Sequence, residues 1–305
     1  MKNILTASQW DKKSLKNLFK MTDRMKSLVE RRGGDDSLKH KVMTALFYES
    51  STRTSSSFIA AMQRLGGSVI PITQGIEFSS VSKGETFYDS LRTLEQYSDV
   101  IVVRHPETGL IESTAPHIKT PIISAGSGSG EHPTQSLLDL YTIKQRFGSI
   151  DGLKIAFVGD ITNGRTIHSL TTLLNLYDTE ISYVSPTSLQ WNGDNGDRYD
   201  KIEDVIHDVD VLYMTRIQSE RMDKSDYDKV KGYYNLTPET MKLAKEDMIV
   251  MHPFPRVNEI DVEVDNDPRA WYFRQIESGL FIRMALLKLL LKPEREFKFS
   301  ILKQG

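Results

Sequence analysis

Residues 41–67 read KVMTALFYESSTRTSSSFIAAMQRLGG and show the pattern from which the fold class can be inferred. Their first part is a continuous apolar run of strand length, which indicates a buried strand. Their second part places Phe58, Ala61, Met62 and Leu65 at the spacing of one helix face. A buried strand that turns directly into an amphipathic helix is typical of a parallel sheet covered by helices.

The same alternation continues outward along the chain. Apolar, strand-like runs occupy residues 67–72, 99–105 and 120–126, then 153–160, 180–186, 210–216 and 248–253. Helical spacing marks residues 15–28, 87–94, 133–147, 166–177, 201–209, 238–246 and about 270–291. The Gly-, Asn- and Asp-rich segment 190–200 has the composition of an exposed loop.

This order predicts an α/β protein made of two doubly wound parallel-sheet domains. A chain of 305 residues suits two domains of roughly 150 residues each. The pattern changes between residues 148 and 152, so we expect one domain over 1–148 and a second over 149–279. The last helix, about 280–305, is long enough to return and complete the first domain.

Composition excludes several classes of protein. The chain has 39 Lys and Arg against 41 Asp and Glu, so neither a nucleic-acid partner nor a membrane surface is expected. It has no cysteine, which excludes disulfides, thiolate zinc sites and a cysteine nucleophile, and a reducing cytoplasm fits best. The charged N-terminus lacks a signal-peptide apolar region. Arg283 and Lys288 interrupt the most apolar tract, so no membrane span is expected.

Polar segments follow six of the predicted strands. In open parallel sheets, ligands bind beyond the carboxyl ends of the strands. The six segments would therefore form a strongly cationic pocket, and we expect its ligand to be a polyanion. Their side chains of interest are Arg53, Arg104, His132, Gln135, Arg165, Arg216 and Gln218.

The STRT sequence at residues 51–54 fits a phosphate site at a strand-to-helix turn. It presents backbone N–H groups at the positive end of a helix, three hydroxyl groups and one guanidinium. Ser and Thr are also ordinary helix caps, so these four residues alone are equally compatible with a capping role. An arginine at each of four strand ends favours the phosphate site.

Seven motifs occur in order along nearly the whole chain. They are STRT at 51–54 with SF at 57–58, SKGET at 82–86, VRHP at 103–106, HPTQSLLDL at 132–140, GDITNGRT with HSL at 159–170, YMTRIQ at 213–218 and HPFPR at 252–256. Together they resemble the motifs of the aspartate/ornithine carbamoyltransferase family, and the likeness is greater to its aspartate-specific branch. The resemblance implies transfer of a carbamoyl group from carbamoyl phosphate to the α-amine of L-aspartate, the committed step of pyrimidine synthesis.

The resemblance also implies a role for each site residue. It assigns carbamoyl phosphate to the domain over 1–148 and aspartate to the domain over 149–279. It implies a homotrimer in which Ser79 and Lys83 reach the neighbouring subunit's site, and it requires neither a cofactor nor a metal. The residues expected to bind carbamoyl phosphate are Ser51, Thr52, Arg53, Thr54, Arg104, His132, Gln135 and Ser79; those expected to bind L-aspartate are Lys83, Arg165, Arg216, Gln218, Pro253 and Phe254.

Within those sets the resemblance implies finer roles. Arg53, Thr54, Arg104, His132 and Lys83 would take part in catalysis. Gln135 would hold the carbamoyl NH2, and Arg165 with Arg216 would clamp the two carboxylates of aspartate. The backbone carbonyls of Pro253 and Phe254 would accept from the incoming amine. The sequence leaves open whether a separate regulatory chain joins the trimers.

Three positions depart from the common family pattern. Ser55 stands where many relatives have arginine, which affects the groups that support the phosphate loop. Ser82 replaces a second lysine, and Phe254 replaces a common leucine.

Other functions fit the residues less well. Ornithine transfer conflicts with Arg216, which would repel a cationic side chain. A nucleotide hydrolase conflicts with Arg165, which stands where the P-loop needs lysine, and with Asp160, an anion facing a triphosphate. A non-catalytic binding protein conflicts with the complete set of arginines.

Overall fold

The computed structural model describes residues 2–73, 83–191, 193, 196–218, 223, 224, 228, 230 and 232–292. The chain divides into two compact units. The first comprises Met1–Tyr141 with Ser278–Gly305, and the second comprises Thr142–Glu277. No helix in the described part of the chain combines the length and the hydropathy that crossing a bilayer requires.

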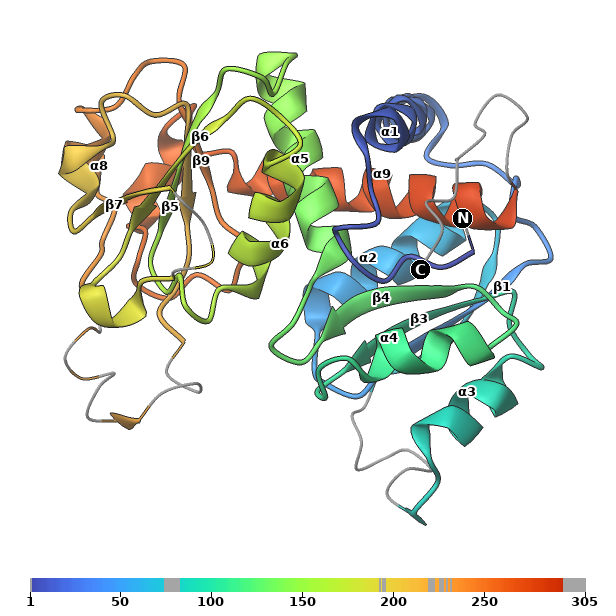
Figure 1. The fold of residues 1–305 in the computed structure, drawn as a ribbon. Helices are drawn as coiled ribbons and strands as arrows, with labels where there is room; N and C mark the ends of the chain where they lie inside the picture. The colour runs from blue at the N-terminus through green and yellow to red at the C-terminus, as the bar shows by residue number, and fades with distance from the viewer. Residues whose placement is uncertain are drawn as a thin grey trace. The chain divides into compact units, whose positions relative to one another are not determined.

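The first unit is built on a sheet with the strand order β2-β1-β3-β4. All the pairings in this sheet are parallel, as the sequence pattern predicts. Figure 1 shows α2 and α9 on one face of the sheet and α3 and α4 on the other. The elements are α1 (Lys12–Arg32), β1 (Val42–Phe47), α2 (Thr52–Arg64), β2 (Ser68–Ile72), α3 (Phe87–Leu94), β3 (Val100–His105), α4 (Leu110–Thr114) and β4 (Ile122–Ser127). Two further helices, α5 (Pro133–Phe147) and α9 (Tyr272–Leu291), are each divided between the two units.

Burial explains why these segments take their places. Ala45 of β1, Val102 of β3 and Ile123 of β4 lie within their strands and have no exposed surface, because helices cover the sheet on both faces. Parallel strands covered in this way are rich in branched apolar residues. Leu91 of α3 and Ile111 of α4 pack on one face in a single apolar cluster with strand residues of β1, β3 and β4.

The second unit is built on a parallel sheet with the strand order β7-β6-β5-β8-β9. Tyr183 and Tyr213 are fully buried in its core and lie on either side of Phe157, which contacts both rings. The two described units therefore confirm the predicted fold class. The elements are β5 (Lys154–Val158), α6 (Arg165–Leu174), β6 (Glu180–Val184), β7 (Asp197–Tyr199), β8 (Val211–Met214), α8 (Pro238–Met241) and β9 (Ile249–Met251).

Two local predictions in the second unit were wrong. The segment 201–209 is not an α-helix; it contains a 3-10 helix at Ile202–Asp204, followed by turns. The segment expected to be only loop contains β7, whose residues Asp197–Tyr199 pair with Ser182–Val184 of β6. In both cases tertiary contacts outweigh local sequence preference.

Candidate functional site

The turn between β1 and α2 carries the predicted phosphate residues. Ser51 occupies the N-cap position of α2 and makes no side-chain capping bond. Its Oγ instead accepts a hydrogen bond from Nη1 of Arg104 over 3.2 Å. The capping alternative is therefore wrong for Ser51. Thr52 and Arg53 are exposed in the first turn of the helix, whereas Thr54 is buried.

Arg104 reaches this turn because β1 and β3 end side by side. Phe47 of β1 pairs with Arg104 of β3 in the parallel register. The next residues of the chain therefore lie beside the guanidinium, and Nε of Arg104 donates to Oε2 of Glu49 over 2.8 Å. The Arg104 side chain is only 14% exposed, so this carboxylate fixes a cation that is largely withdrawn from water.

Ser55 supports the same turn from within. Its hydroxyl is buried and donates to the carbonyl of Ser51 over 2.5 Å, while its backbone N–H donates to the same carbonyl over 3.1 Å. The residue that replaces the more common arginine thus binds the backbone of the loop itself. The carbonyl of Ser51 therefore has two donors, the hydroxyl and the backbone N–H of Ser55.

His132 and Gln135 lie at the start of α5, beyond the end of β4. The carbonyl of His132 accepts the N–H groups of Gln135 and Ser136, over 3.0 and 3.2 Å, and so begins the helix. The ring of His132 is buried, whereas Gln135 is half-buried. Nε2 of Gln135 donates to Oδ1 of Asp139, one helical turn further on, over 2.9 Å.

The segment around Lys83 leads into α3. Lys83 is exposed and precedes Gly84, which has a φ of 92° in the left-handed region that favours glycine. Thr86 then caps α3 by accepting a hydrogen bond from the N–H of Asp89. Ser79 and Ser82 lie outside the described residues.

An aromatic cluster lies beside Arg104 in the same unit. The ring of His105 is 5.1 Å from that of Tyr48 and 4.9 Å from that of Phe87, centroid to centroid. Its Nδ1 accepts the N–H of Glu107, and burial lowers the pKa of this histidine. His105 is therefore neutral at neutral pH and packs the end of β3 against the start of α3.

In the second unit, the loop between β5 and α6 is held by a buried carboxylate. Asp160 has no exposed surface. Its Oδ1 accepts the N–H of Asn163 over 3.0 Å, and its Oδ2 accepts the N–H of Gln218 over 3.4 Å. Nε2 of Gln218 in turn donates to the carbonyl of Asn163 over 3.0 Å. Asp160 thus joins the loops after β5 and β8, and its carboxylate accepts hydrogen bonds from backbone N–H groups of both loops and from Nδ2 of Asn163.

Arg165 and Arg216 stand on these two loops. Arg165 is the first residue of α6, and Arg216 lies two residues beyond the end of β8; both are half-buried. The backbones of the two loops approach closely at Gly159. A Cβ atom there would lie 2.3 Å from the carbonyl oxygen of Thr215, so only glycine fits.

The HPFPR segment after β9 is fixed by a second buried carboxylate. Nδ1 of His252 accepts the N–H of Phe254 over 2.8 Å, which leaves the hydrogen on Nε2 for donation to Glu259 over 2.6 Å. Glu259 also accepts the N–H groups of Val257 and Asn258. The ring of Phe254 packs against Tyr272 and Phe273 of α9, while Pro253 and Phe254 are half-buried.

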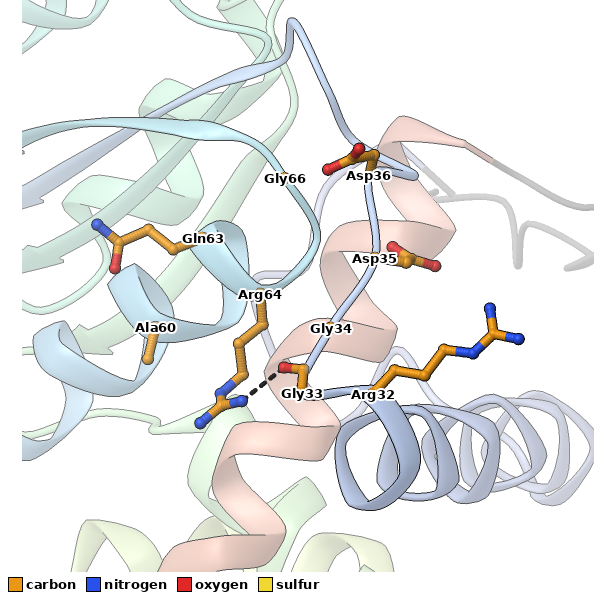
Figure 2. A pocket seen from close by; sticks show the side chains of 9 residues that line it. All are labelled: Arg32, Gly33, Gly34, Asp35, Asp36, Ala60, Gln63, Arg64 and Gly66. Atoms are coloured by element: carbon orange, nitrogen blue, oxygen red, sulfur yellow. Dashed lines mark hydrogen bonds between the residues drawn. The ribbon is translucent and has the colours of Figure 1, made fainter.

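A separate surface hollow of about 830 Å³ contains none of the predicted site residues. Figure 2 shows it between the turn after α1 and the end of α2, where Nη1 of Arg64 donates to the carbonyl of Gly33 over 2.5 Å. Asp35 and Asp36 line it together with Arg32 and Arg64, so its charges are mixed. A hollow of mixed charge does not favour a polyanion over other solutes.

Comparison with known families accounts for both units. Residues 2–145 match the model of the aspartate/ornithine carbamoyltransferase carbamoyl-P binding domain, and residues 151–290 match that of the Asp/Orn binding domain. The chain belongs to the aspartate/ornithine carbamoyltransferase family. Sequence motifs found this membership, but they did not reveal Glu49 and Glu259 as supports of the site. Only strand register and loop folding bring those carboxylates to the residues they bind.

The similarity of this chain to individual members of the family extends over almost its whole length. It is 49% identical over 94% of its length to the multifunctional protein pyr1-3 of Dictyostelium discoideum, of which it spans 13%. It is 46% identical to the aspartate carbamoyltransferase catalytic subunit of Thermoplasma acidophilum, covering 94% of this chain and 97% of that one. A solved structure of aspartate transcarbamoylase from Trypanosoma cruzi, in complex with carbamoyl phosphate and aspartate, aligns with a TM-score of 0.88 and 41% identity, covering 94% of this chain and 95% of that one.

Proposed function

We propose that the chain is an aspartate carbamoyltransferase, which transfers the carbamoyl group of carbamoyl phosphate to L-aspartate and releases phosphate. The observation that carries the proposal is the position of Arg104 beside the turn that begins α2. Its guanidinium contacts both Glu49 and Ser51, at 2.8 and 3.2 Å, and so lies at a helix N-terminus rich in hydroxyl groups. That combination suits the phosphate group of an acyl phosphate.

We also propose which unit binds which substrate. Residues 1–148, completed by the C-terminal segment of about 280–305, bind carbamoyl phosphate, and residues 149–279 bind aspartate. Arg165 and Arg216 supply the two cations that a dicarboxylate needs, and the loops that carry them are joined through Asp160. The same two ligands are named for the Trypanosoma cruzi structure, which supports their assignment to this chain.

The residue types suit the chemistry of this transfer. The amine of aspartate attacks the carbonyl carbon, negative charge develops on the carbonyl oxygen, and the bond to phosphate breaks. Donors fixed toward that oxygen stabilise the transition state, and Thr54, Arg104 and His132 are the proposed donors. The departing phosphate accepts the proton of the amine, so no protein base is needed. Arg53 and Ser51 hold the phosphate, while Gln135 holds the carbamoyl NH2.

The experiment that tests the function compares two acceptors. Purified protein is incubated with carbamoyl phosphate and either L-aspartate or L-ornithine, and the products are separated. We expect carbamoylaspartate with aspartate and little citrulline with ornithine. Preferential formation of citrulline would reject aspartate as the acceptor, and failure to form either product would reject carbamoyl transfer.

We further propose a homotrimer in which Ser79 and Lys83 complete the neighbouring subunit's site. Arg53→Ala and Lys83→Ala proteins should each be nearly inactive. After dissociation and mixing at equal amounts, about three quarters of cyclic trimers contain both chains, and each mixed trimer has one intact site. Activity should therefore recover to about a quarter of the unmutated value. If mass measurement confirms mixed trimers and activity does not recover, the shared site is wrong.

Location and larger assembly remain predictions from the sequence. The absence of cysteine is the basis for proposing the cytoplasm. Native mass measurement of the purified chain, alone and after recovery from its own cells, would show whether a regulatory chain accompanies the trimer.

A further inference from the structure

The ring of Trp191 stacks on the ring of His168 in the second unit. The two centroids lie 4.2 Å apart, and the ring planes are inclined by 25°. Tyr183 lies at right angles to the indole, 6.1 Å away, and a Cβ atom at Gly193 would lie only 2.3 Å from it. Contacts between aromatic rings add to the stability that burial provides. The indole is therefore packed on several sides, although Trp191 belongs to a segment with the composition of an exposed loop.

His168 lies one helical turn after Arg165, at the start of α6. Its Nε2 is 2.8 Å from the carbonyl oxygen of Ile161, and because a carbonyl can only accept, Nε2 carries the hydrogen and donates it. The backbone N–H of His168 donates to the carbonyl of Gly164 over 3.0 Å. The imidazole thus ties the first turn of α6 to the loop that precedes it.

The segment before the indole also binds the loop that leads to Arg165. The backbone N–H of Thr162 donates to the carbonyl of Leu189 over 3.0 Å, and its hydroxyl donates to the carbonyl of Gln190 over 2.8 Å. Through these bonds and the ring stack, residues 185–191 hold the chain on both sides of Arg165. The loop after β6 is thereby joined to the loop after β5.

We propose that Trp191 and His168 are positioning residues that fix the first turn of α6, and with it Arg165, for binding a carboxylate of the acceptor. The inference rests on the proposed function, in which Arg165 binds aspartate. Both rings act through the backbone that carries Arg165 and not by contact with the substrate. A site whose binding-competent conformation is only partly populated loses apparent affinity in the same proportion. Holding this turn in one conformation therefore increases the affinity for the acceptor.

The test measures binding of succinate, which has the two carboxylates of aspartate but no amine and so cannot accept the carbamoyl group. In Trp191→Ala, loss of the ring contact should raise the Kd for succinate, with carbamoyl phosphate bound, about three- to tenfold. The Kd for carbamoyl phosphate should change little, because that ligand is assigned to the first unit. Trp191→Phe keeps a ring in place and should recover most of the affinity. An unchanged Kd for succinate in Trp191→Ala, or an equal rise for both ligands, would overturn the proposal.

Two controls separate positioning from loss of stability. Ser188→Ala changes an exposed position of the same segment and should leave the Kd for succinate as it is. Val209→Ala removes core methyl groups just before β8, whereas Arg165 follows the carboxyl end of the parallel strand β5. It should lower the unfolding temperature without raising this Kd. If Val209→Ala raises the Kd as much as Trp191→Ala at an equal loss of stability, instability alone explains the effect and the positioning role is wrong.

Hydrogen exchange follows the first turn of α6 without any ligand. Trp191→Ala should speed exchange of the backbone N–H groups of residues 165–168 and leave those of β8 unchanged. In an Arg165→Gln background, the same substitution should speed exchange as before but cause little further rise in the Kd for succinate. Unchanged exchange in Trp191→Ala, or additive rises in Kd in the double variant, would contradict action through Arg165.

These measurements do not depend on turnover. A wild-type protein that binds succinate but forms no carbamoylaspartate would reject the proposed function, and the variants would still test the positioning role. An active wild-type protein whose Trp191→Ala variant binds succinate normally would reject the positioning role alone. A wild-type protein that does not bind succinate would reject both aspartate as the acceptor and the positioning of Arg165 for it.

Discussion

The two units use carboxylates in different ways at the ends of their strands. In the first unit Glu49 binds a side chain, the guanidinium of Arg104. In the second unit Asp160 and Glu259 bind backbone N–H groups of the loops that carry the predicted aspartate residues, together with neutral side chains of the same loops. A carboxylate on a guanidinium fixes one cation, whereas a carboxylate on backbone N–H groups fixes the path of a loop. The first arrangement suits stabilisation of charge, and the second suits recognition of shape.

The largest expected effect comes from Arg104, the cation that Glu49 fixes. Arg104→Ala should lower turnover by a factor of about 10² to 10³, because the lost interaction is strongest in the transition state. Steady-state assays check the value, and Arg31→Ala, an exposed position on α1, is the control. Normal turnover with only weaker phosphate affinity would show that Arg104 binds the substrate but does not stabilise the transition state. The first unit would then no longer differ from the second by stabilising charge.

Asp160→Asn tests the loop-fixing carboxylate. The new NH2 group would face a backbone N–H, and an unsatisfied buried group costs about 1–3 kcal/mol. We expect lower thermal stability and a KM for aspartate raised roughly tenfold, with little change in the KM for carbamoyl phosphate. Asp178→Asn, at an exposed position in the same unit, is the matched control. Equal changes in both KM values would contradict a role confined to the second unit.

Glu259 makes the stability of the second unit depend on pH. Burial by itself raises the pKa of Glu259, but the hydrogen bond from His252 and those from backbone N–H donors outweigh it and lower the pKa below its ordinary value of 4.5. The resulting stability is present above about pH 4.5 and is lost as the pH falls through the lower, folded-state pKa. Glu259→Gln should therefore be less stable than wild type at neutral pH, with a difference that narrows in acid. Chemical denaturation at several pH values measures the difference in unfolding free energy between Glu259→Gln and wild type. A difference that does not change with pH would reject the lowered pKa of Glu259 as its cause.

The smallest effect is expected at Ser55. Ser55→Ala removes one hydroxyl donor from the carbonyl of Ser51, which keeps its bond from the backbone N–H of residue 55. A loss of about 0.5–1.5 kcal/mol and a change of a few-fold in the KM for carbamoyl phosphate should follow. Ser56→Ala, exposed on the same helix, is the control. An effect on activity as large as that of Arg104→Ala would mean that the conformation of the phosphate loop matters as much to activity as the charge of Arg104.

Sequence reasoning predicted the features that depend on local pattern. The strand, turn and helix of residues 41–67 were predictable because continuous apolar character and helical spacing meet at STRT. The two parallel sheets followed from regular alternation, and the family from ordered motifs. The binding roles of the site residues stay predictions.

What the sequence could not predict depends on register and tertiary pairing. Strand β7 lies in a segment with the composition of a loop, and only its pairing with β6 makes it a strand. Glu49 contacts Arg104 because β1 and β3 are parallel neighbours in one particular register. In the sequence Arg283 only interrupts an apolar tract, whereas in the fold it is buried against Phe58 of α2.

The division of the chain has a consequence for how the protein forms during synthesis. Residues 142–277 make up the second unit as one uninterrupted segment with its own sheet and core, so this unit has all its parts soon after residue 277 is made. The first unit must wait for Ser278 and the remainder of α9, although most of it leaves the ribosome first. Until then the surface that will receive Ile282, Leu286 and Leu287 stays uncovered. The part of the chain made first is therefore the part completed last, and premature termination within α9 would leave its apolar surface open to aggregation.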